Sequence, residues 1–174
     1  MEAYLARALD EIQRTVGGVP PAALAALACR DARKWTACEI LEHLSLAFTG
    51  TAAAIGKALS SGEPRARVPR LSQRVGRAMV VDVGYFPAVK APELTTPRGT
   101  IPADQSVVAI NAALRAMDEA LTAAEQRFGR RTLLANHPYF AGLTAAQWRK
   151  FHWRHTRHHM KQIRARLREG GQPL

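Results

Sequence analysis

Four histidines lie within eight residues near the C-terminal end of this 174-residue chain, in segment 151–159. Arginine, tryptophan and threonine residues separate them, so the segment is not an expression tag. His155 and His159 are four residues apart, and on an α-helix this spacing places both rings on one face. Two imidazoles placed in this way can bind one divalent metal ion, although an inward-facing histidine is more often a hydrogen-bonded core residue. The spacing alone leaves both roles open.

The helix predicted around these histidines has two chemically different sides. A capping box at Thr144 and Gln147 starts it, and it extends to about Arg168, after which two glycines follow. On a helical wheel the basic side, which we expect to face solvent, holds Lys150, Arg154, Arg157, Lys161, Arg164 and Arg168. The inward side holds Trp148, His152, His155, His159 and Ile163, with Phe151 and Gln162 beside them. Trp148, His152 and Gln162 are therefore candidates for lining a pocket around the histidine pair.

A third ligand would complete an open metal site. His43 flanks the apolar face formed by Ile40, Leu44 and Ala47 on another predicted helix, so its ring can reach the protein interior. The same position also fits a role without metal, in which His43 lies at the helix edge and hydrogen-bonds a backbone carbonyl. Three neutral imidazoles leave coordination positions open on zinc, nickel or iron, which is typical of catalytic rather than structural sites.

Apolar periodicity predicts four main helices and an all-α fold in one domain, residues 1–174. We expect these helices over residues 3–16, 36–60, 104–128 and 144–168. The second begins at a capping box, Thr36 with Glu39, and the third carries a continuous bundle seam from Val107 to Phe128.

Residues 61–103 form a long crossover between the second and third predicted helices. Connections within helical bundles usually have only about 2–8 residues. The crossover contains apolar residues that we expect to be buried: Val80, Val81, Val83, Tyr85, Phe86 and Val89. We therefore predict an ordered wall over the histidine site, or a surface that docks on a second subunit, rather than a loose linker.

The remaining composition indicates a cytoplasmic protein. No apolar run approaches the roughly 18 residues that span a membrane, and the first residues lack the basic and apolar regions of a signal peptide. Cys29 and Cys38 do not have a metal-binding or disulfide-framework spacing.

Two segments resemble the motifs of the DinB/YfiT-like superfamily. Residues 34–36, Lys-Trp-Thr, with the following 39–44, resemble the first motif, in which a helix carries a metal-binding histidine. Residues 155–163 resemble the second motif, H-x-x-H-H-x-x-Q/H-I/L, in which the first and last histidines are ligands. Residues 137–144, together with Trp148, are similar to a bacterial branch of unknown function.

The resemblance implies a four-helix bundle with a long crossover between helices two and three, and a divalent metal held by His43, His155 and His159. Better understood members of the superfamily are transferases and isomerases that use low-molecular-weight thiols, and many are dimers. We therefore expect a homodimeric, metal-dependent transferase, isomerase or hydrolase that acts on a small molecule. Arg74, Arg77 and Arg98 in the crossover are candidates for holding an anionic group of the substrate or thiol, or else are solvated surface residues.

Two other functions fit the sequence. The net charge is +11, concentrated in residues 127–174 and 65–100, so the protein can bind nucleic acid or an acidic partner. However, the chain contains no helix-turn-helix, zinc-finger or single-strand-binding motif, and aromatic residues make up only 6%. Nucleic-acid binding is therefore expected to be weak, independent of sequence and sensitive to salt. A bundle that binds metal without catalysis is the other alternative.

Overall fold

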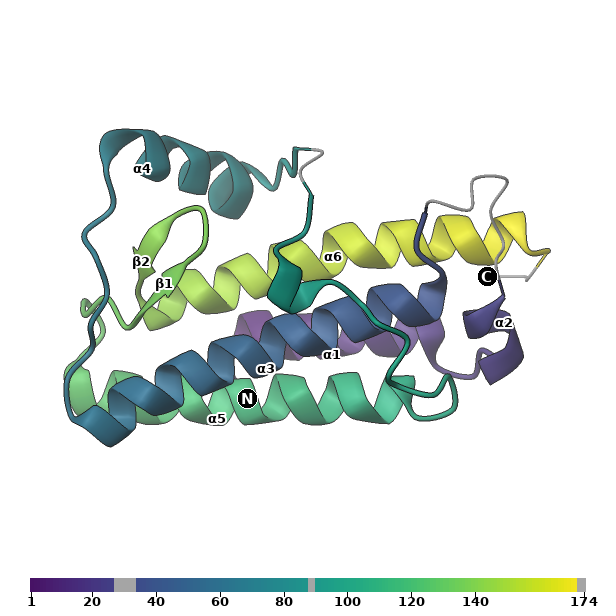
Figure 1. The fold of residues 1–174 in the computed structure, drawn as a ribbon, viewed down its shortest axis with the longest axis horizontal. Helices are drawn as coiled ribbons and strands as arrows, with labels where there is room; N and C mark the ends of the chain where they lie inside the picture. The colour runs from purple at the N-terminus through teal and green to yellow at the C-terminus, as the bar shows by residue number, and fades with distance from the viewer. Residues whose placement is uncertain (27–33, 88–89, 172–174) are drawn as a thin grey trace.

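A computed structural model describes residues 1–26, 34–87 and 90–171, and these are mostly helical, as predicted (Figure 1). The helices α1, α3, α5 and α6 lie lengthwise beside one another, whereas α4 and a small β-hairpin lie outside them. The elements are α1 (Ala3–Val16), α2 (Pro21–Ala25), α3 (Ala37–Ser61), α4 (Leu71–Arg77), a π-helix η1 (Ala78–Val83), a 3-10 helix η2 (Glu93–Thr95), α5 (Ser106–Phe128), β1 (Ala135–His137), β2 (Ala141–Leu143) and α6 (Ala145–Glu169). That residues 1–174 form a single domain stays a prediction.

The helices that carry the histidines, α3 and α6, both begin at the capping boxes expected from the sequence. The Thr36 hydroxyl accepts the Glu39 N–H, and the Glu39 carboxylate accepts the Thr36 N–H. Thr144 and Gln147 make the same reciprocal pair at the start of α6. These bonds satisfy amides that have no partner within the helix, so they define where each helix starts.

The core is formed by apolar faces of the four long helices. The α5 seam predicted from the sequence is fully buried at Ile110, Leu114, Met117 and Leu121. It packs with buried residues of the other long helices, among them Leu5, Ile12, Ile40, Leu44, Phe48, Ile55, Met160 and Ile163. Each large aliphatic side chain of this kind contributes about 1.5–3 kcal/mol when buried, so this apolar core does not depend on the three candidate metal ligands.

Two charge pairs, one of them buried and one partly buried, join α6 to its neighbours. Arg149 is 5% exposed, and its guanidinium donates to the Glu125 carboxylate at 2.6 Å and to the Thr122 hydroxyl at 3.1 Å, both on α5. Arg164 donates to Glu11 and Thr15 on α1. The expectation that Arg164 faces solvent is therefore wrong, because α1 packs along that side of α6 and supplies a carboxylate and a hydroxyl.

The crossover follows α3 with three short helices, α4, η1 and η2, and then leads to α5 (Figure 1). Of its apolar residues, Val80 and Val81 are buried and Phe86 packs against the core. Val83 and Tyr85 were expected to be buried, but they are 74% and 57% exposed. Val83 is the last residue of η1, on the side away from the buried Val80 and Val81, and Tyr85 lies beyond the Gly84 that ends this helix. The expectation for Val89 lies outside the described residues.

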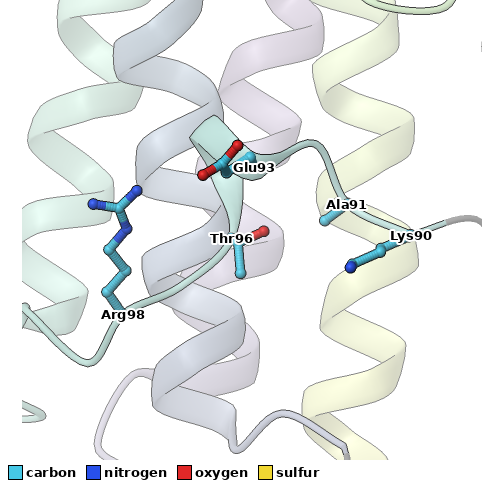
Figure 2. A pocket seen from close by; sticks show the side chains of 5 residues that line it. All are labelled: Lys90, Ala91, Glu93, Thr96 and Arg98. Carbon is cyan, nitrogen blue, oxygen red and sulfur yellow. The ribbon is translucent and has the colours of Figure 1, made fainter.

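One residue of the crossover, Asp82, attaches it to α6. The carboxylate of Asp82 in η1 accepts a 2.5 Å bond from Lys150, and its backbone carbonyl accepts one from Arg154, so η1 is tied to α6. Farther along, residues 90–98 form a hollow of about 570 Å³, lined by Lys90, Ala91, Glu93, Thr96 and Arg98 (Figure 2). The crossover therefore contacts the long helices through both apolar and charged side chains.

The β1–β2 hairpin between α5 and α6 was not predicted, because its three-residue strands are too short to show an alternating pattern. Its strands pair antiparallel, with Ala135 opposite Leu143. Gly142 donates its N–H to the carbonyl of Arg67 at 2.9 Å, and a Cβ at this position would lie 2.7 Å from that oxygen. Glycine is therefore required for the crossover to approach the hairpin.

No helix in the described parts of the chain combines the length and the apolar character needed to cross a lipid bilayer.

Candidate metal centre

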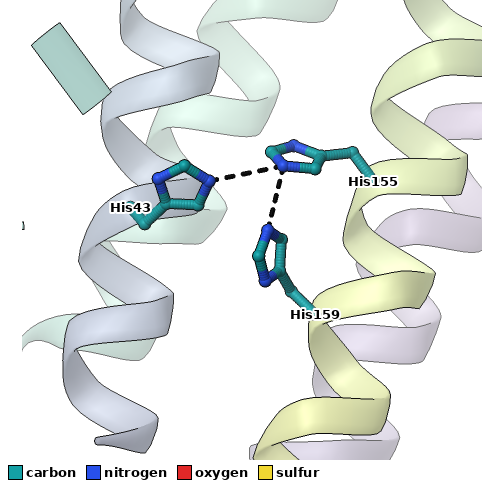
Figure 3. A group of neighbouring side chains, drawn as sticks. All are labelled: His43, His155 and His159. Atoms are coloured by element: carbon teal, nitrogen blue, oxygen red, sulfur yellow. Dashed lines mark hydrogen bonds between the residues drawn. The ribbon is translucent and has the colours of Figure 1, made fainter. Parts of the chain in front are cut away.

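Three histidines from two helices meet between α3 and α6 (Figure 3). His43 comes from α3, and His155 and His159 come from successive turns of α6. The Nε2 atom of His155 lies 3.3 Å from that of His43 and 2.9 Å from that of His159. Zinc bound to three tetrahedrally arranged nitrogens at about 2.0–2.1 Å would hold them about 3.3 Å apart. Two of the three separations are within about 0.4 Å of this value, and all three ligand atoms lie within 4.8 Å of one another, so the three residues could hold one metal ion.

Hydrogen bonds on the far side of two rings orient their Nε2 atoms toward the centre. His43 donates its Nδ1–H to the Thr95 carbonyl at 2.6 Å, and His159 donates its Nδ1–H to Gln162 Oε1 at 2.7 Å. A neutral imidazole carries only one ring proton, so both Nε2 atoms are left with a free lone pair. Partners of this kind fix the tautomer and the ring orientation of metal-ligating histidines.

The ring of His155 is oriented by aromatic stacking, whereas the rings of His43 and His159 are oriented by hydrogen bonds at Nδ1. Its ring stacks on Phe151 at 5.3 Å between centroids and on Phe86 of the crossover at 5.7 Å. Its Nδ1 is buried and has no hydrogen-bond partner in the described part of the chain. A proton on this nitrogen leaves the Nε2 lone pair directed at the other two histidines. Three lone pairs then face one another, an arrangement that a cation would stabilise.

The electrostatics favour the neutral form of these histidines. Burial is the main cause that lowers the pKa of His43, His155 and His159, and the pKa of His159 falls to about 3. The proximity of the other imidazoles lowers the pKa of His155 and His159 further, whereas the hydrogen bond to Thr95 partly offsets the decrease for His43. At neutral pH the cluster is therefore in the deprotonated state that metal coordination requires.

Glu42, which the sequence analysis did not single out, holds the crossover against the cluster. Its carboxylate is buried and accepts the N–H groups of Arg98, Gly99 and Thr100, together with the Thr100 hydroxyl at 2.6 Å. Burial raises the pKa of Glu42, but these four bonds outweigh it and the pKa is lowered overall. The available signal was a charged residue between Leu41 and Leu44 on the apolar side of a helix.

The crossover reaches the cluster at two points. The Thr95 carbonyl bonds His43, and the Phe86 ring covers His155 and also stacks on His158 at 4.9 Å. These contacts are those expected of a wall over the site. The 570 Å³ hollow in Figure 2 adjoins this wall at Thr96, but none of the three histidines lines it, so it is not the metal pocket itself.

Of the three predicted pocket residues, Gln162 contacts the histidine cluster, whereas Trp148 and His152 lie in the core. Gln162 bonds His159, as described above. His152 is 1% exposed and bonds the Thr51 hydroxyl at 3.0 Å, and it stacks on Trp148 with an interplanar angle of 18°. His152 and Trp148 are core residues, and neither lines the 570 Å³ hollow. His137 likewise stacks on Phe140 at 4.3 Å.

The three candidate anion-binding arginines do not form one group. Arg98 lines the 570 Å³ hollow, and its backbone N–H bonds Glu42. Arg74 and Arg77 lie in the last turn of α4 and do not line this hollow. The structure therefore brings the three candidate ligands together and leaves the three arginines apart.

The fold and site define a mostly helical protein with a buried group of three histidines that could hold a metal ion. A family model described as a protein of unknown function, DUF1569, matches residues 20–166, so the chain belongs to the DUF1569 family. No curated protein and no solved structure matches the chain.

Proposed function

We propose that this protein is a metal-dependent enzyme with a DinB/YfiT-like four-helix bundle, formed by α1, α3, α5 and α6. His43, His155 and His159 are the proposed ligands. The observation that carries the proposal is the convergence of three Nε2 atoms, two of them with tautomers set by Thr95 and Gln162. With His155 in its Nδ1–H tautomer, the three Nε2 lone pairs face one another, and a bound cation is the partner that would satisfy them.

The ligand set indicates which chemistry is available. Three neutral imidazoles leave at least one coordination position open on zinc, nickel or iron. When bound, such an ion acts as a Lewis acid or lowers the pKa of a coordinated thiol or water, which produces a nucleophile at neutral pH. The chain itself orients the ligands through Thr95 and Gln162, and Phe86, Phe151 and Trp35 restrict water around the rings.

The substrate class is a further part of the proposal. The resemblance to the DinB/YfiT-like superfamily favours a low-molecular-weight thiol and a small-molecule substrate, used by a transferase, an isomerase or a hydrolase. Arg98 and Lys90 in the adjoining hollow offer positive charge for a carboxylate of such a ligand. The homodimer and the cytoplasmic location are proposed from the resemblance and the composition alone.

Nucleic-acid binding through α6 is less consistent with the ion pairs of this helix. Arg149, Arg164 and Arg166 bond acids or backbone groups within the protein, and Lys150 and Arg154 bond Asp82. Few basic side chains of α6 are therefore left for phosphate contacts along an extended surface. Any DNA binding should be weak and should disappear as salt is raised, which a titration at two ionic strengths would measure.

Metal analysis tests the metal site directly. The wild-type protein, loaded with zinc, nickel or iron and then desalted, should retain about one ion per chain by elemental analysis. His155→Ala and His159→Ala should each lose most of it and keep their helical circular dichroism, because the apolar core is separate. His158→Ala, on the same helix, is the control and should retain the ion. Equal metal content in all four proteins would contradict the proposed site.

The catalytic part of the proposal needs a separate assay. The metal-loaded protein should convert an electrophilic small molecule in the presence of a low-molecular-weight thiol, or should hydrolyse an activated ester, and His159→Ala should abolish the turnover. A protein that binds metal but shows no activity across both substrate types would leave the non-catalytic metal-binding bundle as the better interpretation.

A further inference from the structure

A second hollow lies on the other side of α6 from the core, where η1 ends. It has a volume of about 160 Å³ and is lined by Val83 and Gly84 from the crossover and by Arg154, Arg157, His158 and Lys161 from α6. Three of the six lining residues are arginine or lysine and none is acidic. Like charges gathered around one small hollow repel one another, so an anion is the ligand that this lining would favour.

The basic residues around the hollow differ in how they are held. Arg154 is anchored, because its Nη2 donates to the Asp82 carbonyl at 3.0 Å, while its buried Nε has no partner in the described residues. Arg157 and Lys161 are exposed and make no hydrogen bond or ion pair with the described part of the chain. By contrast, the carboxylate of Asp82, the nearby acid, is bonded to Lys150. The donors at the hollow are therefore available.

His158 adds a fourth donor in a set orientation. The side-chain amide of Gln162 bonds His159 through its oxygen and lies 3.2 Å from His158 Nε2 through its nitrogen. The amide N–H is the donor in that second contact, so His158 Nε2 accepts and the ring proton of the neutral form is on Nδ1. Phe86 stacks on the ring at 4.9 Å and restrains it. Donors from two successive turns of α6 thus border one hollow.

We propose that this hollow binds a compact tetrahedral oxyanion, such as phosphate or the phosphate group of a small molecule. A volume of about 160 Å³ corresponds to about five waters at roughly 30 Å³ each, which is enough for such a group. Three cations match a dianion better than a singly charged carboxylate. The planar fork of arginine also suits phosphate oxygens. The site does not require the metal, since none of its lining residues is a proposed ligand.

The test is isothermal titration of the full-length protein with inorganic phosphate, at pH 8 and low ionic strength. A chelator removes metal first, so the result is independent of the metal site. The wild type should bind phosphate saturably at one site. The double variant Arg157→Gln/Lys161→Gln should bind about ten-fold more weakly or worse, because two charge-assisted contacts are lost. The matched control Lys57→Gln/Arg168→Gln removes the same charge at two exposed positions outside the hollow and should stay within about two-fold of wild type.

Several results would overturn the proposal. They are the absence of saturable binding to the wild type, an equal loss in both double variants, and acetate or chloride binding as tightly as phosphate. Sulfate, a tetrahedral dianion without a phosphate's protonation steps, should bind like phosphate. Arg157→Lys in place of Arg157→Gln should restore part of the affinity, whereas a variant that had lost its fold would also lose its helical circular dichroism.

Discussion

His152 and His155 lie about one turn apart on the same helix, yet their surroundings give them different roles. His152 bonds the Thr51 hydroxyl and stacks on Trp148. His155 directs its Nε2 at two other imidazole nitrogens. The α3 residue opposite His152 is Thr51, and the α3 residue opposite His155 is His43, eight residues earlier. The residue that the neighbouring helix places opposite a histidine, more than burial or spacing, therefore decides whether that histidine can bind a metal.

The largest expected effect on stability is at the core histidine. His152→Ala removes a buried ring from contact with Trp148, Phe48 and Thr51. The free energy of unfolding of the metal-free protein should fall by about 2–4 kcal/mol, as for other large-to-small core substitutions. Urea denaturation would measure this. A loss below about 0.5 kcal/mol would show that His152 is not the tightly packed residue seen in the structure.

Zinc binding should distinguish His152 from the proposed ligand His159, and here the substitution of His159 should have the larger effect. Zinc at one hundred times its dissociation constant should stabilise the wild type by about 2.7 kcal/mol, because it binds only the folded state. His152→Ala should keep this increment, and His159→Ala should lose it. Thermal melts with and without zinc would measure both. An increment that survives in His159→Ala would place the bound zinc elsewhere.

Glu42→Gln tests whether the crossover is part of the metal centre. The amide cannot accept all four bonds that the carboxylate accepts, so the free energy of unfolding should fall by about 2 kcal/mol near neutral pH. Because the folded-state pKa of Glu42 is lowered, the stability it contributes is present above its unfolded pKa of 4.5 and is lost as the pH falls through the folded pKa. The difference between the variant and wild type should therefore shrink in acid.

The same substitution should also weaken zinc binding, since Glu42 positions the segment that bears the Thr95 carbonyl. Thr49→Val on the exposed part of α3 is a control that should change neither property. Unchanged zinc affinity in Glu42→Gln would mean that the crossover does not position His43.

The smallest expected effect, taken per pH unit, is the pH dependence of the metal-free protein, in which His152 and His159 should behave alike. Burial brings the pKa of both His152 and His159 to about 3, from 6.5. Between these values the unfolded chain binds more protons than the folded one, so stability falls as the pH decreases from about 6.5. Each site contributes at most about 1.4 kcal/mol per pH unit. His152→Gln and His159→Gln should each flatten this dependence, measured by denaturation at several pH values, and a slope unchanged in either variant would contradict the assignment.

Short-range signals predicted the positions of the helices well. The capping boxes at Thr36 and Thr144 mark where α3 and α6 begin, because these bonds join residues only three apart. The wheel likewise placed His155 and His159 on one face, since helix geometry alone relates them. The π-helix, the hairpin and the exposure of Val83 and Tyr85 were not predicted, because no regular period extends through those segments.

The sequence by itself determined a mostly helical chain, the starts of the helices and the one-face pairing of His155 with His159. The third ligand followed only from the resemblance or from a guess about which face of α3 is inward. Only the tertiary structure decided that His43 rather than Thr51 lies opposite this pair, that the Thr95 carbonyl and Glu42 fix the surrounding segment, and that Arg157 and Lys161 border a hollow. The physical reason is that these relations join residues far apart in the chain, and helix packing rather than local periodicity sets their distances.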